Sequence, residues 1–337
     1  MHGELLRQSV IMVFSERHFT EELASISGDP IEITSETPLM TQLLLCTDLD
    51  RTLIPNGDRQ ESENARRRFA EVACRPEITL VYVSGRDRNL VEKAIAEFAI
   101  PEPGWVIGDV GSSLYQLQPN HRAGGQSDHA GKPSWLFSRA WQEEISLDWP
   151  GFARKQIAET LKDFGELVPQ EPERQGSYKL SYYLPIGFEL EKLRSKITSK
   201  HEERGVHSCL IYSVDPQTQQ GLLDVMPLRA TKLHAVEFLM KQLGITAANT
   251  VFAGDSGNDM PILTSSVPSV LVANADPDII EEARSCSIEK GTSEFLYLAK
   301  GNFLGMNGNY SAGILEGLAH YHPETKGWIE PRPIFRS

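Results

Sequence analysis

The sequence has few cysteines and no long apolar run. Its four cysteines, Cys46, Cys74, Cys209 and Cys286, form no CxxC pair within 337 residues, so they predict neither a zinc cluster nor a disulfide scaffold. No segment approaches the roughly 20 apolar residues that span a bilayer. The apolar run at 10–14 is also too short for the core of a signal peptide. These absences predict a soluble, cytoplasmic protein with reduced thiols.

Basic side chains are in the minority. Lys and Arg number 33 against 46 Asp and Glu, which gives a formal net charge of −13. Sequence-independent nucleic-acid binding depends on Lys and Arg that face phosphates, and an anionic membrane surface would repel this chain. We therefore expect no nucleic-acid partner and no membrane partner. A small anionic substrate remains compatible with the charge, because a bound cation can invert the local field.

Apolar strands and helical segments alternate along most of the chain. Strands are expected at 43–47, 78–83 and 105–107, with helices between them, and the alternation resumes with a helix at 231–243 and a strand at 250–253. This pattern predicts an α/β fold with a Rossmann-like, doubly wound parallel sheet. Between the two halves, 121–225 has strands and helices typical of an inserted α+β module. The expected divisions are an N-terminal extension (1–40), the core (41–120 and 226–322), the insert (121–225) and a C-terminal tail (323–337).

Four acids follow two of the predicted strands. Asp48 and Asp50 come after 43–47, and Asp255 and Asp259 come after 250–253. Ligands of open α/β sheets bind outside the carboxyl ends of the strands, so we expect these carboxylates to meet there. Without a counter-charge they would repel one another and resist ionising. Because Mg²⁺ prefers oxygen ligands, the four acids predict a magnesium site rather than a set of helix caps.

Other residues suit a phosphate group. Ser84 offers a hydroxyl, Gly85 an unobstructed N–H and Lys232 a positive charge. Alone, Ser84 would predict a helix N-cap and Lys232 a solvated lysine. The chain has no GxSxG segment and no cysteine in a reactive context, so the predicted nucleophile is a carboxylate that forms an aspartyl-phosphate. Asp48 and Asp50 fit the roles of nucleophile and acid/base.

In this order the segments resemble the motifs of the haloacid dehalogenase superfamily of phosphatases. Asp48-x-Asp50-x-Thr52 is similar to the first motif, Ser84 to the second, Lys232 to the third and 254–259 to the fourth. The resemblance covers about 42–320 and identifies the insert as a type C2 cap. It implies that Asp48 is the nucleophile and Asp50 the acid/base. It also implies two sets of ligands: Asp48, the Asp50 carbonyl and Asp255 for Mg²⁺, supported by Asp259, and Ser84, Lys232 and Asn258 for the phosphoryl group.

A narrower resemblance points to sucrose-phosphate phosphatases. It is carried by the segments 177–182, 254–259 and 311–317 and by Asp224 shortly before Pro227. The resemblance implies sucrose 6-phosphate as the leading substrate and leaves open an association with the upstream glycosyltransferase. That family usually carries Glu where this chain has Ser113, so the exact sugar stays open. The residues that the resemblance places near the sugar are Arg86, Gly111, Ser112, Ser113 and Lys179.

Other functions compete with this interpretation. A phospho-acceptor signalling domain also gathers acids, a hydroxyl and a lysine around Mg²⁺, but it needs only about half this length and would avoid the acid/base Asp50. A catalytically idle sugar-phosphate-binding protein would have no need of the full motif set. Among enzymes, the alternative is a phosphatase for another glycosyl phosphate, such as a glucosyl- or mannosyl-phosphoglycerate. A phosphomutase ranks behind it.

Overall fold

The computed structural model describes residues 42–118, 134–215, 218 and 220–330. The chain divides into two units, Met1–Leu39 and Met40–Ser337, and the described residues all belong to the second. The N-terminal extension expected for 1–40 therefore lies outside the described residues. Over the part of the chain that is described, no helix combines the length and the apolar composition needed to cross a bilayer.

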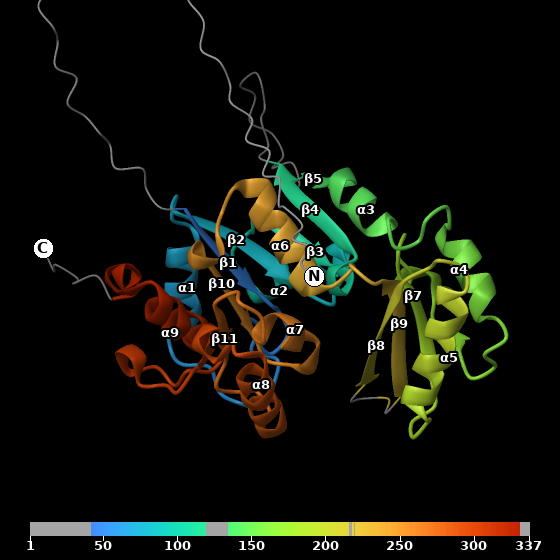
Figure 1. The fold of residues 1–337 in the computed structure, drawn as a ribbon. Coiled ribbons are helices and arrows are strands. Elements are labelled where there is room, and N and C mark those ends of the chain that lie inside the picture. The colour runs from blue at the N-terminus through green and yellow to red at the C-terminus, as the bar shows by residue number, and fades with distance from the viewer. Residues whose placement is uncertain (1–41, 119–133, 216–217, 219, 331–337) are drawn as a thin grey trace, which may run out of the picture. The chain divides into compact units, whose positions relative to one another are not determined.

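An eight-stranded sheet forms the centre of the core (Figure 1), in the order β12-β11-β10-β1-β2-β3-β4-β5. The first six strands in this order pair in parallel, and β4 and β5 are antiparallel at one edge. Strand β1, which is entirely buried, lies between β2 and β10, where the order of the strands along the chain reverses. Such a switch point is where open α/β sheets bind ligands. The strands are β1 (Leu43–Thr47), β2 (Ile78–Val83), β3 (Trp105–Gly108), β4 (Ser113–Gln118), β5 (Ser134–Phe137), β10 (Thr250–Gly254), β11 (Ser269–Leu271) and β12 (Leu296–Leu298).

Helices cover both faces of this sheet, as the doubly wound prediction requires. One buried cluster joins the sheet to α1, α2 and α9, through residues such as Phe69, Val91 and Leu315. A second cluster joins the opposite face to α3, α6, α7 and α8, through residues such as Leu239 and Ile262. The α/β prediction is confirmed. The helices are α1 (Ala65–Ala73), α2 (Arg88–Phe98), α3 (Arg139–Ser146), α6 (Lys232–Leu243), α7 (Met260–Leu263), α8 (Pro277–Lys290) and α9 (Ser311–Tyr321).

The insert forms a second, four-stranded antiparallel sheet in the order β6-β7-β9-β8. Its strands are β6 (Val168–Pro169), β7 (Leu180–Leu184), β8 (Ser208–Asp215) and β9 (Gln220–Pro227), and its helices are α4 (Arg154–Leu161) and α5 (Leu190–Glu202). Both helices pack on one face of the sheet, where Leu180, Tyr182 and Leu223 are buried. Because side chains alternate along a strand, Ser181 and Asp224 point to the other face. We call this α+β module the cap.

The cap begins later in the chain than the sequence suggested. Residues 134–146 were expected in the insert, but β5 pairs with β4 in the larger sheet. Trp141 of α3 is fully buried in the core and donates its indole N–H to the Gly111 carbonyl. The centre of its ring lies 5.1 Å from that of Phe238 in α6, and the two rings are tilted against each other. The expected boundary between 120 and 121 therefore falls between two strands that form one antiparallel pair.

The expected C-terminal tail also needs correction within its described part. Helix α10 (Lys326–Ile329) packs against α1, and Ile329 is buried in the same cluster as Phe69. The Arg75 guanidinium lies 4.2 Å from the centre of the Trp328 ring. Four residues are too few to show a helical period, so this packing could not be predicted from the sequence. Residues 331–337 lie outside the described residues.

Candidate active site

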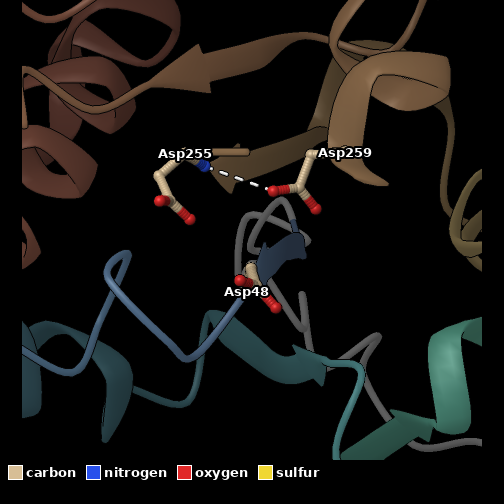
Figure 2. A group of neighbouring side chains, drawn as sticks. All are labelled: Asp48, Asp255 and Asp259. Carbon is tan, nitrogen blue, oxygen red and sulfur yellow. Dashed lines mark hydrogen bonds between the residues drawn. The ribbon is translucent and has the colours of Figure 1, made fainter. Parts of the chain in front are cut away.

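The predicted chemical groups converge at the carboxyl ends of the central strands. Asp48 follows β1, Ser84 follows β2, Asp255 follows β10, and Lys232 is the first residue of α6. Figure 2 shows the carboxylates of Asp48, Asp255 and Asp259 turned toward one another from two separate segments of the core. Residues about 200 positions apart in the sequence therefore lie together at this edge of the sheet.

Three of the four predicted acids could hold a cation together. One carboxylate oxygen from each of Asp48, Asp255 and Asp259 lies within 4.8 Å of the others, and all three residues are buried. Burial and the neighbouring carboxylates raise the pKa of Asp48 to about 8 and that of Asp255 to about 7, although Lys232 opposes both shifts. A nearby divalent cation would favour the charged forms.

The hydrogen bonds of the two Asp255 carboxylate oxygens indicate whether a cation fits at this site. Its Oδ1 accepts a hydrogen bond from Thr52 at 3.0 Å, while its buried Oδ2 has no hydrogen-bond donor among the described residues. The nearest cation to Oδ2 is the guanidinium of Arg51, whose Nε lies 3.4 Å away. A buried carboxylate oxygen without a donor is costly, and a metal ion would satisfy it. The residues present therefore fit a divalent cation with oxygen ligands.

Asp259 supports the site and has both of its oxygens engaged. Its Oδ1 accepts from Lys232 at 2.6 Å, and its Oδ2 accepts from the N–H groups of Asp255 and Ser256. Only glycine fits at position 254 beside this carboxylate, because a Cβ there would lie 2.6 Å from Asp259 Oδ2. The Gly254-Asp255 turn is thus built around Asp259.

Lys232 brings a fixed positive charge to the acids. Its Nζ donates to Asp48 Oδ1 at 3.1 Å, to Asn258 Oδ1 at 3.0 Å and to Asp259 Oδ1 at 2.6 Å. Thr231 caps the helix by accepting a hydrogen bond from the backbone N–H of His234, which sets where α6 begins. Burial alone would lower the pKa of Lys232, but the carboxylates of Asp259 and Asp48 raise it above its usual value. Lys232 therefore stays protonated.

Asp50 and Arg86 form a pair that the sequence did not predict. Arg86 Nε donates to Asp50 Oδ2 at 2.7 Å and its Nη2 to Oδ1 at 2.6 Å, while Asn56 donates to the same Oδ1 at 2.7 Å. Partial burial raises the pKa of Asp50, but these hydrogen bonds and the Arg86 charge outweigh it and lower that pKa. The Asp50 side chain lies outside the group of three acids. Arg86, which the resemblance placed near the sugar, is bound to Asp50 and lines the smaller of the two cavities described below.

A cavity of about 320 Å³ lies directly over these groups. The core contributes Asp48, Asp50, Gly85 and Asn258 to its lining, and the cap contributes Arg174. Ser84 is not one of the lining residues; it is 1% exposed and accepts a hydrogen bond from the Arg86 N–H. Anionic and cationic side chains therefore surround a space that suits a phosphoryl group.

A second cavity of about 560 Å³ adjoins the first and shares four of its residues. Its other walls include the open face of the cap sheet, with Lys179, Ser181 and Asp224, and the cap residue Arg194. The shared residues are Gly85, Arg174, Ser256 and Asn258. A ligand can therefore extend from the smaller cavity, which we call the phosphate cavity, toward the cap.

The loop Gly111-Ser112-Ser113 does not line either cavity. Ser112 and Ser113 line a separate cavity of about 300 Å³, and their hydroxyls donate to the carbonyl and the carboxylate of Asp109. Gly111 packs on the start of α6, where a Cβ would lie 2.4 Å from the carbonyl carbon of Thr231. Position 111 therefore requires glycine, because the backbone there lies too close to the backbone of Thr231 to leave room for a Cβ. Of the residues placed near the sugar, Lys179 alone lines the larger cavity.

Sequence reasoning missed several residues of the site. Arg174, Arg194 and Asp109 match no motif spacing, and only the folded cap brings the two arginines to the cavities. The alternation of side chains through 178–184, which is typical of a strand, did carry a signal, because it separates the buried face of β7 from the polar face that lines the cavity. Asp224 was noticed for its place in the sequence but was given no role.

Comparisons with known proteins agree with this geometry. The family model of sucrose-6F-phosphate phosphohydrolases matches residues 41–322. A HAD-like hydrolase of Nitrosococcus oceani is 45% identical over 86% of this chain and 74% of its own length. A mannosylfructose-phosphate phosphatase of Agrobacterium fabrum is 27% identical over 82% of this chain and 96% of its own length. The chain spans only 52% to 59% of the plant sucrose-phosphatases that it matches.

One solved structure is similar over nearly its whole length. It is the sucrose-phosphatase of Synechocystis sp. PCC6803 in complex with sucrose and phosphate. The TM-score is 0.62 at 25% sequence identity, and the match covers 84% of this chain and 98% of that one.

Proposed function

The chain belongs to the sucrose-6F-phosphate phosphohydrolase family of haloacid dehalogenase-type phosphatases, a family of phosphoric monoester hydrolases, and we propose from this that it hydrolyses sucrose 6-phosphate to sucrose and phosphate. The observation that carries the proposal is the pair of joined cavities. The smaller one surrounds Asp48 with groups for a phosphoryl group, and the larger one presents polar cap residues where a sugar would extend.

In the first half-reaction, an oxygen of Asp48 attacks phosphorus and the bond from phosphorus to the sugar oxygen breaks. Asp50 donates a proton to that oxygen, so the sugar leaves as an alcohol. The product is an aspartyl-phosphate on Asp48. Lys232, which lies 3.1 Å from Asp48 Oδ1, offsets the negative charge that gathers there.

In the second half-reaction, the Asp50 carboxylate takes a proton from a water molecule. The water oxygen attacks phosphorus, the bond to Asp48 breaks, and phosphate is released. The Arg86 fork stabilises Asp50 as a carboxylate, which suits this step. We propose Mg²⁺ as the divalent cation, held by Asp48 and Asp255, where it would offset the charge of the phosphoryl oxygens.

A second substrate class is favoured by a specific observation. The cap brings two guanidinium groups, those of Arg174 and Arg194, to the larger cavity. Arg174 also lines the smaller cavity, but Arg194 lines only the larger one. A neutral disaccharide does not need a guanidinium there, whereas a carboxylate on the leaving group would pair with it. The alternative is therefore a glycosyl phosphate that carries an acid, such as a glucosyl- or mannosyl-phosphoglycerate.

A phosphate-release assay with Mg²⁺ separates these substrates. The panel is sucrose 6-phosphate, mannosylfructose phosphate, glucose 6-phosphate, fructose 6-phosphate and a glucosyl-phosphoglycerate, with Asp48→Asn as the inactive control. We expect the highest kcat/KM for sucrose 6-phosphate, because a site that hydrogen-bonds sugar hydroxyls discriminates against molecules that lack them. A clear preference for the glycerate would select the alternative. Release from none of them would refute both.

The cellular setting is a further part of the proposal. We place the enzyme in the cytoplasm, after the glycosyltransferase that makes its phosphorylated sugar. Association with that glycosyltransferase would be tested by co-purification of the two proteins from cells that express both. Independent elution at every salt concentration would contradict it.

A further inference from the structure

A buried ion pair joins the cap to the core beside the larger cavity of about 560 Å³, which we call the sugar cavity. Lys179 directly precedes β7 in the cap, and Asp109 directly follows β3 in the core. The Lys179 Nζ lies 3.1 Å from Asp109 Oδ1. Their side chains are only 9% and 15% exposed. Since one charge comes from each module, the pair can form only while the cap lies over the core.

Asp109 is held firmly on the core side. Its second oxygen accepts from the Ser113 hydroxyl at 3.0 Å, its N–H donates to the Arg86 carbonyl, and the next N–H, of Val110, donates to the Ser84 carbonyl. The carboxylate that meets the cap is therefore anchored to the loop that carries Ser84 and Arg86.

The backbone of this loop is strained. Asp109, Val110 and Gly111 all have positive φ, at 51°, 60° and 107°, although the first two are not glycine and Val110 is β-branched. Strain of this kind persists where the surrounding structure enforces it, and it concentrates at functional sites. This strain therefore indicates that the orientation of the Asp109 side chain serves a specific role.

Lys179 lies between two carboxylates. Asp109 is its ion-pair partner, and Asp224 lines the sugar cavity beside it, with its own hydrogen bond from Ser181. If the Asp109 charge is removed, the ammonium group retains only the acceptor on the cap sheet and is drawn toward Asp224. Asp109 thus determines where Lys179 stands in the cavity.

We infer that Asp109 is a positioning residue for sugar recognition, which holds Lys179 at the sugar cavity and ties the closed cap to the core. The inference rests on the phosphatase activity and on a sugar phosphate as substrate, but not on which sugar is bound. It assigns no chemical step to Asp109.

The test compares Asp109→Asn with wild type on two substrates. One is the sugar phosphate that the panel identifies as best, and the other is para-nitrophenyl phosphate, which has no sugar hydroxyls. We expect KM for the sugar phosphate to rise about tenfold with little change in kcat, since a binding interaction is lost. The values for para-nitrophenyl phosphate should stay within about twofold of wild type. The matched control is Asp163→Asn, which removes a carboxylate from the exposed Lys200–Asp163 pair inside the cap.

A double-mutant cycle with Lys179→Met separates positioning from a merely structural role. If the two residues act as a pair, the double variant should have a KM no higher than the worse single variant. Additive effects, or equal losses on both substrates, would overturn the inference. The same cycle followed by thermal unfolding needs no substrate, and additive shifts in Tm would also overturn it. A wild-type enzyme that releases phosphate from no sugar phosphate would instead refute the proposed function and leave the unfolding cycle as the deciding result.

Discussion

The substitution Arg86→Gln removes the guanidinium group that holds Asp50, the proposed acid/base, through two hydrogen bonds. In the native site, Arg86 donates two charge-assisted hydrogen bonds to Asp50, at 2.7 and 2.6 Å. Such bonds contribute about 1.5–3 kcal/mol each when shielded from water. Asp50 is 41% exposed and Arg86 is 23% exposed, so solvent screening reduces this value, and we take about 1.5 kcal/mol for the pair.

That loss predicts a change in pH dependence. Arg86 lowers the pKa of Asp50, so its removal raises that pKa. Asp50 must be a carboxylate to take a proton from water. The rate of the second half-reaction should therefore begin to fall at a higher pH than in wild type. In the alkaline plateau, kcat should also drop by up to about 10²-fold, because Asp50 is less well oriented.

The assay is kcat against pH with para-nitrophenyl phosphate. Its leaving group needs no proton, so the second half-reaction limits the rate and reports on Asp50 as a base. Arg67→Gln is the control, because Arg67 pairs with Glu71 on the exposed side of α1. An acid limb that coincides with that of wild type in a folded Arg86→Gln protein would refute the reasoning.

Three further outcomes are expected. A chelator should abolish activity, Mg²⁺ should restore it and Ca²⁺ should restore it poorly, and full activity in excess chelator would contradict the metal site. Arg174→Gln should lower kcat/KM by about tenfold while Lys162→Gln, a remote cap cation, leaves it unchanged, as measured by phosphate release. Gly111→Ala should lower the free energy of unfolding by about 2–4 kcal/mol, measured with urea, because it adds a backbone clash to a positive φ. Gly151→Ala has the positive φ without the clash and should lose only about 1 kcal/mol.

The parallel core could be predicted because its signal is local. Strands such as β1 and β2 are short, buried apolar runs, and each ends in the residues that make the site. Once strands are ordered, their carboxyl ends must share one edge of the sheet, so the meeting of Asp48 with Asp255 follows. Spacing alone was enough for this part of the site.

The direction of individual side chains could not be predicted in this way. Arg86 and Asp50 lie 36 positions apart, and only the geometry of two loops decides that the guanidinium meets the carboxylate rather than a sugar. Lys179 and Asp109 come from different modules, and their pairing depends on how the cap covers the core. The limits of the cap were misjudged for a related reason, since β5 looks like any short strand until it pairs with β4.

The most direct test of the central claim is to find where the phosphoryl group is held during turnover. Asp50→Asn should slow the breakdown of the aspartyl-phosphate, so acid quenching after mixing with sucrose 6-phosphate should trap it. Peptide mass spectrometry is expected to locate the phosphate on Asp48, with no adduct in the matched Asp48→Asn/Asp50→Asn double variant. A phosphoryl group on any other residue, or steady turnover by Asp48→Asn, would contradict the account.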